Sequence, residues 1–163
     1  MREPEVGTLG NCSRVLAGAL PGIWLGMLIG VSFLATPVKF QATGLDLAVA
    51  LEVGHVTFRT FGRIEVVLAL TLALATIGAW RPSWQQSISL LLLVIVALQA
   101  LWLLPALNAR VMQVVSGTLP APSFHHHAYA IFELTKGVML LGLTVATART
   151  AVAPRDKSNW PAA

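Results

Sequence analysis

Apolar runs long enough to cross a lipid bilayer recur along this chain, and they constrain its fold more than any other feature. A helix rises about 1.5 Å per residue, so crossing a hydrocarbon core of about 30 Å takes about 20 mainly apolar residues. Such runs lie at about 15–36, 62–80, 86–107 and 124–148. Because backbone groups inside lipid must bond within their own segment, we expect an all-α protein, a bundle of four transmembrane helices.

The composition favours a membrane protein over a soluble one. Apolar residues make up 56% of the 163 residues and charged residues only 11%, whereas soluble domains carry roughly 25% charged residues. The formal net charge is +4, but the basic residues lie mostly at the ends of the apolar runs and not in one patch. This arrangement is typical of membrane anchoring, so we expect a lipid bilayer and no nucleic acid as partner.

The chain has room for one transmembrane domain, which we place at 15–149. A cytoplasmic tail at 1–14 and a disordered tail at 150–163 would flank it. The segment 46–63 mixes charged and apolar residues, so the second helix is predicted to be long and partly interfacial. Pro105 is expected to kink the third helix, because proline removes a backbone hydrogen bond.

The first span carries a stripe of glycines at every fourth position: Gly18, Gly22, Gly26 and Gly30. Glycines on one helix face allow another helix to approach closely, which matters in lipid because no hydrophobic force draws helices together. The stripe predicts close packing inside the bundle, since a four-helix protein has internal neighbours to satisfy first. The alternative is a homo-oligomer or a docking face for a membrane partner protein.

Ionisable side chains inside a span are costly to bury, so each of them is a candidate functional residue. In the fourth span His126, Tyr129, Glu133 and Lys136 follow at intervals of 3, 4 and 3 residues and share one helix face. Glu133 and Lys136 can pair, because residues three apart are neighbours on a helix. The stripe predicts a ligand or proton site that faces the bundle interior, or else a neutralised structural pair.

Polar residues in the second and third spans extend this pattern. Glu65 lies just inside an apolar run and nearly opposite Arg63 on the helix, so we expect its partner on another helix. Gln99, near the middle of the third span, is able to hydrogen-bond between helices.

A four-span topology brings the segments 38–63 and 108–122 and the start of the fourth helix to one end of the bundle. Basic and histidine side chains would gather there as a mouth above Glu133: Lys39, His55, Arg59, Arg63, Arg110 and His126. Such a mouth suits an anionic ligand, a proton path or a metal, and the spacing does not choose among them.

No catalytic residue and no cofactor is predicted, because the motifs of soluble enzymes are missing from the sequence and Cys12 is the sole cysteine. Adjacent helical residues point about 100° apart, so the three histidines at 125–127 cannot easily share one metal ion. A haem held between His55 and His126 is geometrically possible within a four-helix bundle. A haem- or metal-dependent membrane oxidoreductase is therefore the enzyme alternative.

Three stretches together resemble a known family: 33–40 (FLATPVKF), 53–59 (VGHVTFR), and 104–110 (LPALNAR) followed by the helix of His126. They resemble an uncharacterised bacterial four-helix membrane "domain of unknown function" family, which is similar to the eukaryotic transmembrane proteins linked with cisplatin resistance. The resemblance implies four spans, with Asn108 and Arg110 at the end of the third helix and His126 at the start of the fourth. A weaker likeness to four-helix haem-, porphyrin- or copper-handling membrane proteins supports the oxidoreductase alternative.

We therefore expect a small protein of the bacterial inner membrane that binds or moves a small solute or ion, or, as a further alternative, serves as a structural subunit of a membrane complex. Its candidate binding residues come from the second, third and fourth helices and the segments beside them: His55, Arg59, Arg63, Asn108, Arg110, His126, Tyr129, Glu133 and Lys136. Basic residues are slightly more numerous on the side of the two termini than on the other, so both termini are expected in the cytoplasm.

Overall fold

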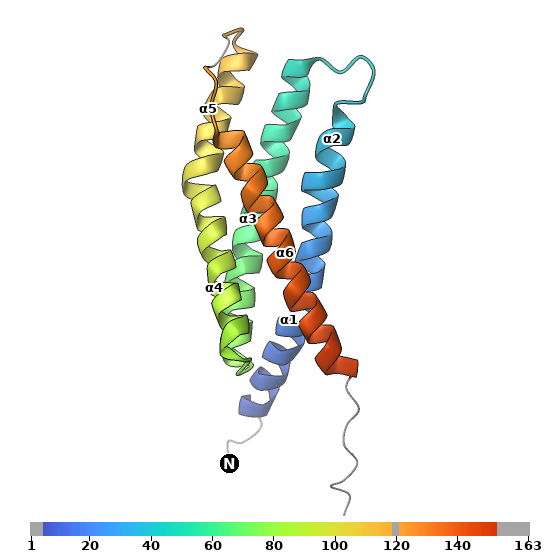
Figure 1. The fold of residues 1–163 in the computed structure, drawn as a ribbon, viewed down its shortest axis with the longest axis vertical. Coiled ribbons are helices and arrows are strands. Elements are labelled where there is room, and N and C mark those ends of the chain that lie inside the picture. The colour runs from blue at the N-terminus through green and yellow to red at the C-terminus, as the bar shows by residue number, and fades with distance from the viewer. Residues whose placement is uncertain (1–4, 119–120, 153–163) are drawn as a thin grey trace, which may run out of the picture.

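The computed structural model describes residues 5–118 and 121–152, which form four long helical rods and, over those residues, no strand (Figure 1). The first rod consists of α1 (Glu5–Leu28), the π-helical segment η1 (Ile29–Ala35) and α2 (Thr36–Lys39). The second is α3 (Leu47–Gly78). The third consists of α4 (Ser83–Leu98), the π-helical segment η2 (Gln99–Leu103) and α5 (Leu104–Val115), and the fourth is α6 (His125–Val152).

Each rod contains a stretch that is long and apolar enough to cross a membrane. The prediction of an all-α protein with four spans is therefore confirmed. The helices extend beyond the predicted spans: α1 begins at Glu5, inside the segment that we expected to be a tail. Residues 1–4 and 153–163 lie outside the described residues, and with them most of the tail predicted at 150–163.

The rods run antiparallel, so the bundle has two distinct ends (Figure 1). The start of α1, the α3–α4 turn and the end of α6 lie at what we call the terminus end. The α2–α3 and α5–α6 connections lie at the opposite, loop end. α1 and α4 each pack against both α3 and α6. α3 and α6 are therefore the diagonal pair, and residues that join them must meet in the centre of the bundle.

Apolar side chains occupy both the interior and the outer surface. The interior cluster draws on all four rods: Leu20, Trp24, Leu28, Phe61, Ala69, Leu72, Leu92, Val96, Leu140 and Leu143. On the outside, Leu74 and Val138 are 70% and 71% exposed. A surface of this kind is suited to lipid, which solvates apolar side chains as well as the protein interior does.

The glycine stripe of the first span faces two different environments. A Cβ atom at Gly22 would lie 3.5 Å from Thr144 Cγ2 of α6, and one at Gly18 would lie 3.9 Å from Arg81 Nη2. At Gly26 and Gly30 a Cβ would meet nothing within 4 Å. A four-residue repeat drifts by about 40° per step around a helix, so the stripe turns away from α6 along its length.

This placement separates the two interpretations of the stripe by experiment. We expect Gly22→Leu to destabilise the protein by about 1–3 kcal/mol, because the larger side chain must displace Thr144. Gly26→Leu should leave the unfolding temperature in detergent close to that of the wild type. If instead Gly26→Leu changes the oligomeric state in size-exclusion chromatography, the open half of the stripe is a contact between chains.

Candidate functional site: a buried ionic cluster

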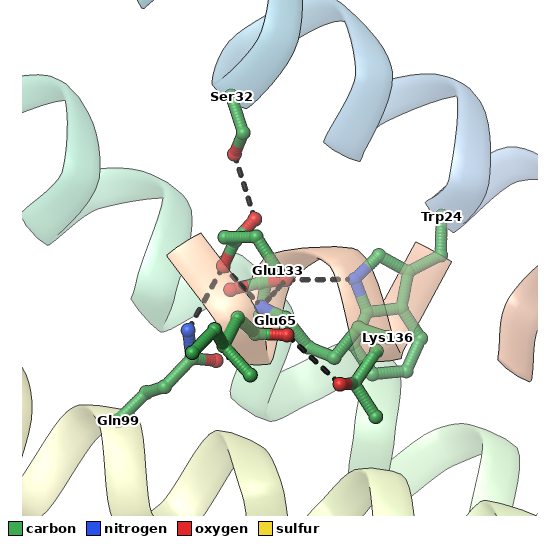
Figure 2. Close-up of polar contacts among 8 residues, drawn as sticks. Trp24, Ser32, Glu65, Gln99, Glu133 and Lys136 are labelled. Atoms are coloured by element: carbon green, nitrogen blue, oxygen red, sulfur yellow. Dashed lines mark hydrogen bonds and ion pairs between the residues drawn. The ribbon is translucent and has the colours of Figure 1, made fainter. Parts of the chain in front are cut away.

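Three charged side chains of the diagonal helices α3 and α6 meet in the centre of the bundle (Figure 2). Lys136 Nζ lies 2.6 Å from Glu65 Oε1 and 2.7 Å from Glu133 Oε1. Glu65 and Glu133 are each 2% exposed and Lys136 is fully buried. The predicted pair of Glu133 and Lys136 is present, and the partner of Glu65 is on another helix, as expected. We refer to these three residues as the ionic cluster.

Neutral side chains from the other two rods complete the coordination of the carboxylates (Figure 2). Trp24 Nε1 donates a hydrogen bond of 3.0 Å to Glu65 Oε1. Ser32 Oγ donates to Glu133 Oε2 at 2.7 Å, and Gln99 Nε2 donates to Glu133 Oε1 at 2.9 Å. Every rod therefore contributes to the cluster, and its geometry depends on the assembly of the whole bundle.

The two π-helical segments supply two of these three donors, since Ser32 lies in η1 and Gln99 opens η2. Each segment ends immediately before a proline-containing helical turn. The Thr36 N–H bonds to the Val31 carbonyl, and the Leu104 N–H bonds to the Gln99 carbonyl, each five residues back. Proline removes one backbone donor and its ring crowds the carbonyl four residues earlier, which favours this wider turn. The sequence predicts a kink at Pro105, and the π-helical segment η2 lies immediately before the turn that contains this proline.

A π-helical turn contains one residue more than an α-helical turn. It therefore changes the directions in which the side chains before and after it point. Single π-helical turns inside α-helices occur frequently at functional sites. Here they lie at the level of Glu133 in two different rods and direct the polar side chains Ser32 and Gln99 toward it.

The charges in the cluster do not balance when all three groups are ionised, because two carboxylates face one ammonium. The remaining negative charge is buried between membrane spans, where an uncompensated charge costs several kcal/mol. The other titratable side chain facing Glu133 is Tyr129, which is buried one turn earlier in α6. Among the described residues, the first and third rods contribute the neutral donors Trp24, Ser32 and Gln99 to the cluster. A proton shared by the two carboxyl groups would neutralise the cluster.

The surroundings of the cluster differ on its two sides. Seven of the ten interior apolar residues lie on the terminus side of it, and Trp24 and Leu28 lie at its level. Phe61 and the fully buried Leu103 lie on the loop side. On the loop side the packing includes the edge-to-face contact of Phe58 with Tyr129, at 5.4 Å between ring centroids. Most of the apolar interior therefore separates the cluster from the terminus end, whereas Ser32 and Tyr129 lie toward the loop end.

The structure brings together only part of the predicted site. Tyr129, Glu133 and Lys136 are buried, while Arg59, Arg63 and His126 are exposed. No hydrogen bond or ion pair among the described residues joins the predicted mouth residues to one another or to Asn108: Lys39, His55, Arg59, Arg63, Arg110 and His126. Arg110 donates instead to the backbone carbonyl of Ala121. Their role in ligand binding stays a prediction.

The histidines are likewise dispersed. His125 stacks on Phe124, with 4.7 Å between ring centroids, and the rings of His126 and His127 lie 6.2 Å apart. Within the described residues, no group of three or more His, Cys, Asp or Glu side chains is arranged to hold a metal ion. The haem alternative would rest on His55, which is half-buried, and on His126.

Sequence reasoning missed Trp24 and Ser32 as parts of the site. A tryptophan within a span is usually explained by packing or by the membrane interface. A single serine in a span gives no indication in the sequence of which side chain it hydrogen-bonds. The available signal was the polar side chain of Ser32 in the last third of an apolar run, a few residues before Pro37.

The fold and the cluster define a class: a small multi-pass membrane protein with a buried ionic network shared by all four rods. The chain belongs to the family described as a domain of unknown function (DUF4149), which matches residues 19–116. The match includes Trp24, Ser32, Glu65 and Gln99 and ends before α6, which carries Glu133 and Lys136. Comparisons with curated proteins and with solved structures gave no match.

Proposed function

We propose that this membrane protein takes up and releases a proton at the Glu65–Glu133 pair, and that the exchange accompanies the binding or movement of a small solute or ion. The observation that carries this proposal is the contact of one ammonium, Lys136 Nζ, with two buried carboxylates. Two carboxyl groups that share one site do not readily ionise together. Such a pair holds a proton that the surrounding solution or a bound cation can replace.

The surroundings of the cluster support access from one side. Ser32, which bonds Glu133, is half-buried and lies in the half of the first rod nearest the loop end. The predicted His and Arg residues of the mouth belong to the same end of the rods. We therefore place the entry path between the loop end and Glu133, past Tyr129. The proposal includes a bacterial inner membrane with both termini in the cytoplasm, and the basic residues near the termini support this orientation.

Infrared spectroscopy tests the shared proton directly. Difference spectra of the reconstituted wild type, recorded between two pH values that both lie above the range in which exposed carboxyl groups bind protons, should contain the carbonyl stretch of a protonated carboxyl group that exchanges with solvent. Glu133→Gln should abolish this band, because the remaining Glu65 and Lys136 then balance each other; Glu65→Gln should abolish it for the same reason. Glu52→Gln, which removes an exposed carboxyl group of the same helix, is the matched control and should keep it.

The infrared band also distinguishes a proton-exchanging site from an ion pair that only stabilises the bundle. A purely structural ion pair predicts that both carboxyl groups stay ionised, so the wild type would show no exchangeable band. That result, or a band that persists in both Glu133→Gln and Glu65→Gln, would refute the proposal. The unfolding temperature of each variant in detergent verifies that the bundle remains folded.

A further inference from the structure

A groove opens at the terminus end of the bundle, on the other side of the apolar interior from the ionic cluster. Its volume is about 700 Å³, and it lies between α1, the α3–α4 turn and the last turns of α6. Its lining includes Arg14 and Gly18 of α1, Trp80 and Arg81 of the turn, and Thr147 and Ala148 of α6. None of these residues belongs to the predicted mouth, and the proton-exchange proposal uses none of them. Gly18 is the one residue among them that also belongs to the glycine stripe.

The groove is positively charged and contains guanidinium N–H donors that are not used in hydrogen bonds within the described residues. Arg14 and Arg81 are its charged residues, and no acidic side chain is among those described in its lining. Arg81 Nη2 makes one long hydrogen bond, 3.5 Å, to the Arg14 carbonyl oxygen. Arg81 Nε is buried and has no hydrogen-bond partner among the described residues. A guanidinium presents five N–H donors in a planar fork that matches phosphate oxygens, so Arg81 has donors left for an anionic group.

The position of Arg81 sets the level of the groove in the membrane. The second span ends at Gly78 and the third begins at Ser83, so Arg81 lies at the boundary between hydrocarbon and water. Trp80, which is 91% exposed, and Trp84 flank it, as expected for side chains at the headgroup level. Beside Arg81 the wall consists of small residues, Gly18 and Ala148 among them, together with the methyl-bearing side chains of Thr144 and Thr147, and these leave room for an alkyl chain.

We propose that this groove binds an anionic phospholipid, with its phosphate on the guanidinium groups of Arg81 and Arg14 and an acyl chain against α1 and α6. Two features select a lipid over soluble phosphate: the wall of small, mainly apolar residues beside the arginines and the opening at the membrane boundary. The double positive charge favours a headgroup with net negative charge over a zwitterionic one.

Native mass spectrometry of the full-length protein, released from micelles that contain equal amounts of phosphatidylglycerol and phosphatidylcholine, tests the proposal. We expect the wild type to retain phosphatidylglycerol preferentially. Arg81→Gln should reduce the retained lipid about tenfold, the effect of losing a charge-assisted hydrogen bond. Arg149→Gln is the matched control: Arg149 is exposed at the same end of α6 but does not line the groove, so its removal should leave retention unchanged.

A second variant removes the space and keeps the charge. Ala148→Phe places a large side chain in the groove while Arg14 and Arg81 remain, and it should reduce retention as Arg81→Gln does. The proposal is overturned if Arg81→Gln and Arg149→Gln lose lipid equally, which would mean general attraction of anionic lipid to a basic surface. It is also overturned if millimolar inorganic phosphate displaces the lipid, which would identify a soluble anion as the ligand, or if Ala148→Phe retains lipid as the wild type does.

Discussion

Replacing Lys136 with methionine is expected to destabilise the bundle by about 3–5 kcal/mol, because the substitution leaves two buried carboxyl groups without their counter-charge. Methionine keeps most of the length and the apolar volume of lysine, so the loss reports mainly on charge. Thermal or denaturant unfolding in detergent at neutral pH measures it. The two carboxyl groups of the folded variant must then bind protons that the unfolded chain releases, so the stability of Lys136→Met should rise as the pH falls.

Two comparisons make this result specific to the cluster. Lys39→Met removes another lysine of a membrane span, one that forms no ion pair among the described residues, and should cost far less. Adding Glu65→Gln and Glu133→Gln to Lys136→Met removes every charge of the cluster and should recover much of the lost stability. An Lys136→Met variant that unfolds like the wild type at neutral pH would show that the ammonium does not touch both carboxylates.

Trp24→Ala should have an effect of similar size, about 3–5 kcal/mol, since it empties the space of a large and fully buried side chain. It also removes the indole donor to Glu65 Oε1. Trp24→Phe fills most of the space but lacks the donor, so it should cost about 1.5–3 kcal/mol, the value of a hydrogen bond to a charged group. Unfolding in detergent measures both variants.

The two substitutions at Trp24 separate packing from polar coordination. If Trp24→Phe were as stable as the wild type, the indole N–H would contribute nothing to holding Glu65. Trp84→Ala is the control for tryptophan content: Trp84 is 46% exposed at the end of the bundle, and its removal should change the stability little.

Local periodicity was enough to predict the parts of the site that lie within one helix. The interval between Glu133 and Lys136 places the two groups side by side whatever the rest of the chain does, and the structure contains that pair. Glu65 opposite Arg63 indicated a partner on another helix, and that prediction is confirmed. The identity of the partner lay beyond reach, because 71 residues separate Glu65 from Lys136 and no helical repeat relates them.

The predicted mouth of basic residues could not be established from local periodicity. The four-span topology places His55, Arg110 and His126 in the same end of the rods, but topology does not state how each rod is rotated about its axis. That rotation depends on the packing of α1 and α4 between α3 and α6, and on the extra residue in each of η1 and η2. Arg59 and His126 consequently lie on the exposed surface, and Ser32 and Gln99 face the interior.

Four apolar runs and their charged ends were sufficient, by themselves, to determine a four-span all-α membrane protein, because the cost of exposing a backbone or a charge to lipid leaves no other fold. They also determined that buried ionisable groups would have to be compensated. The tertiary structure alone decided that the compensation is a cluster of two carboxylates on one lysine, held by Trp24, Ser32 and Gln99 from two other rods. The physical reason is that lipid fixes how deep a residue lies, whereas contacts between helices far apart in sequence fix what it touches.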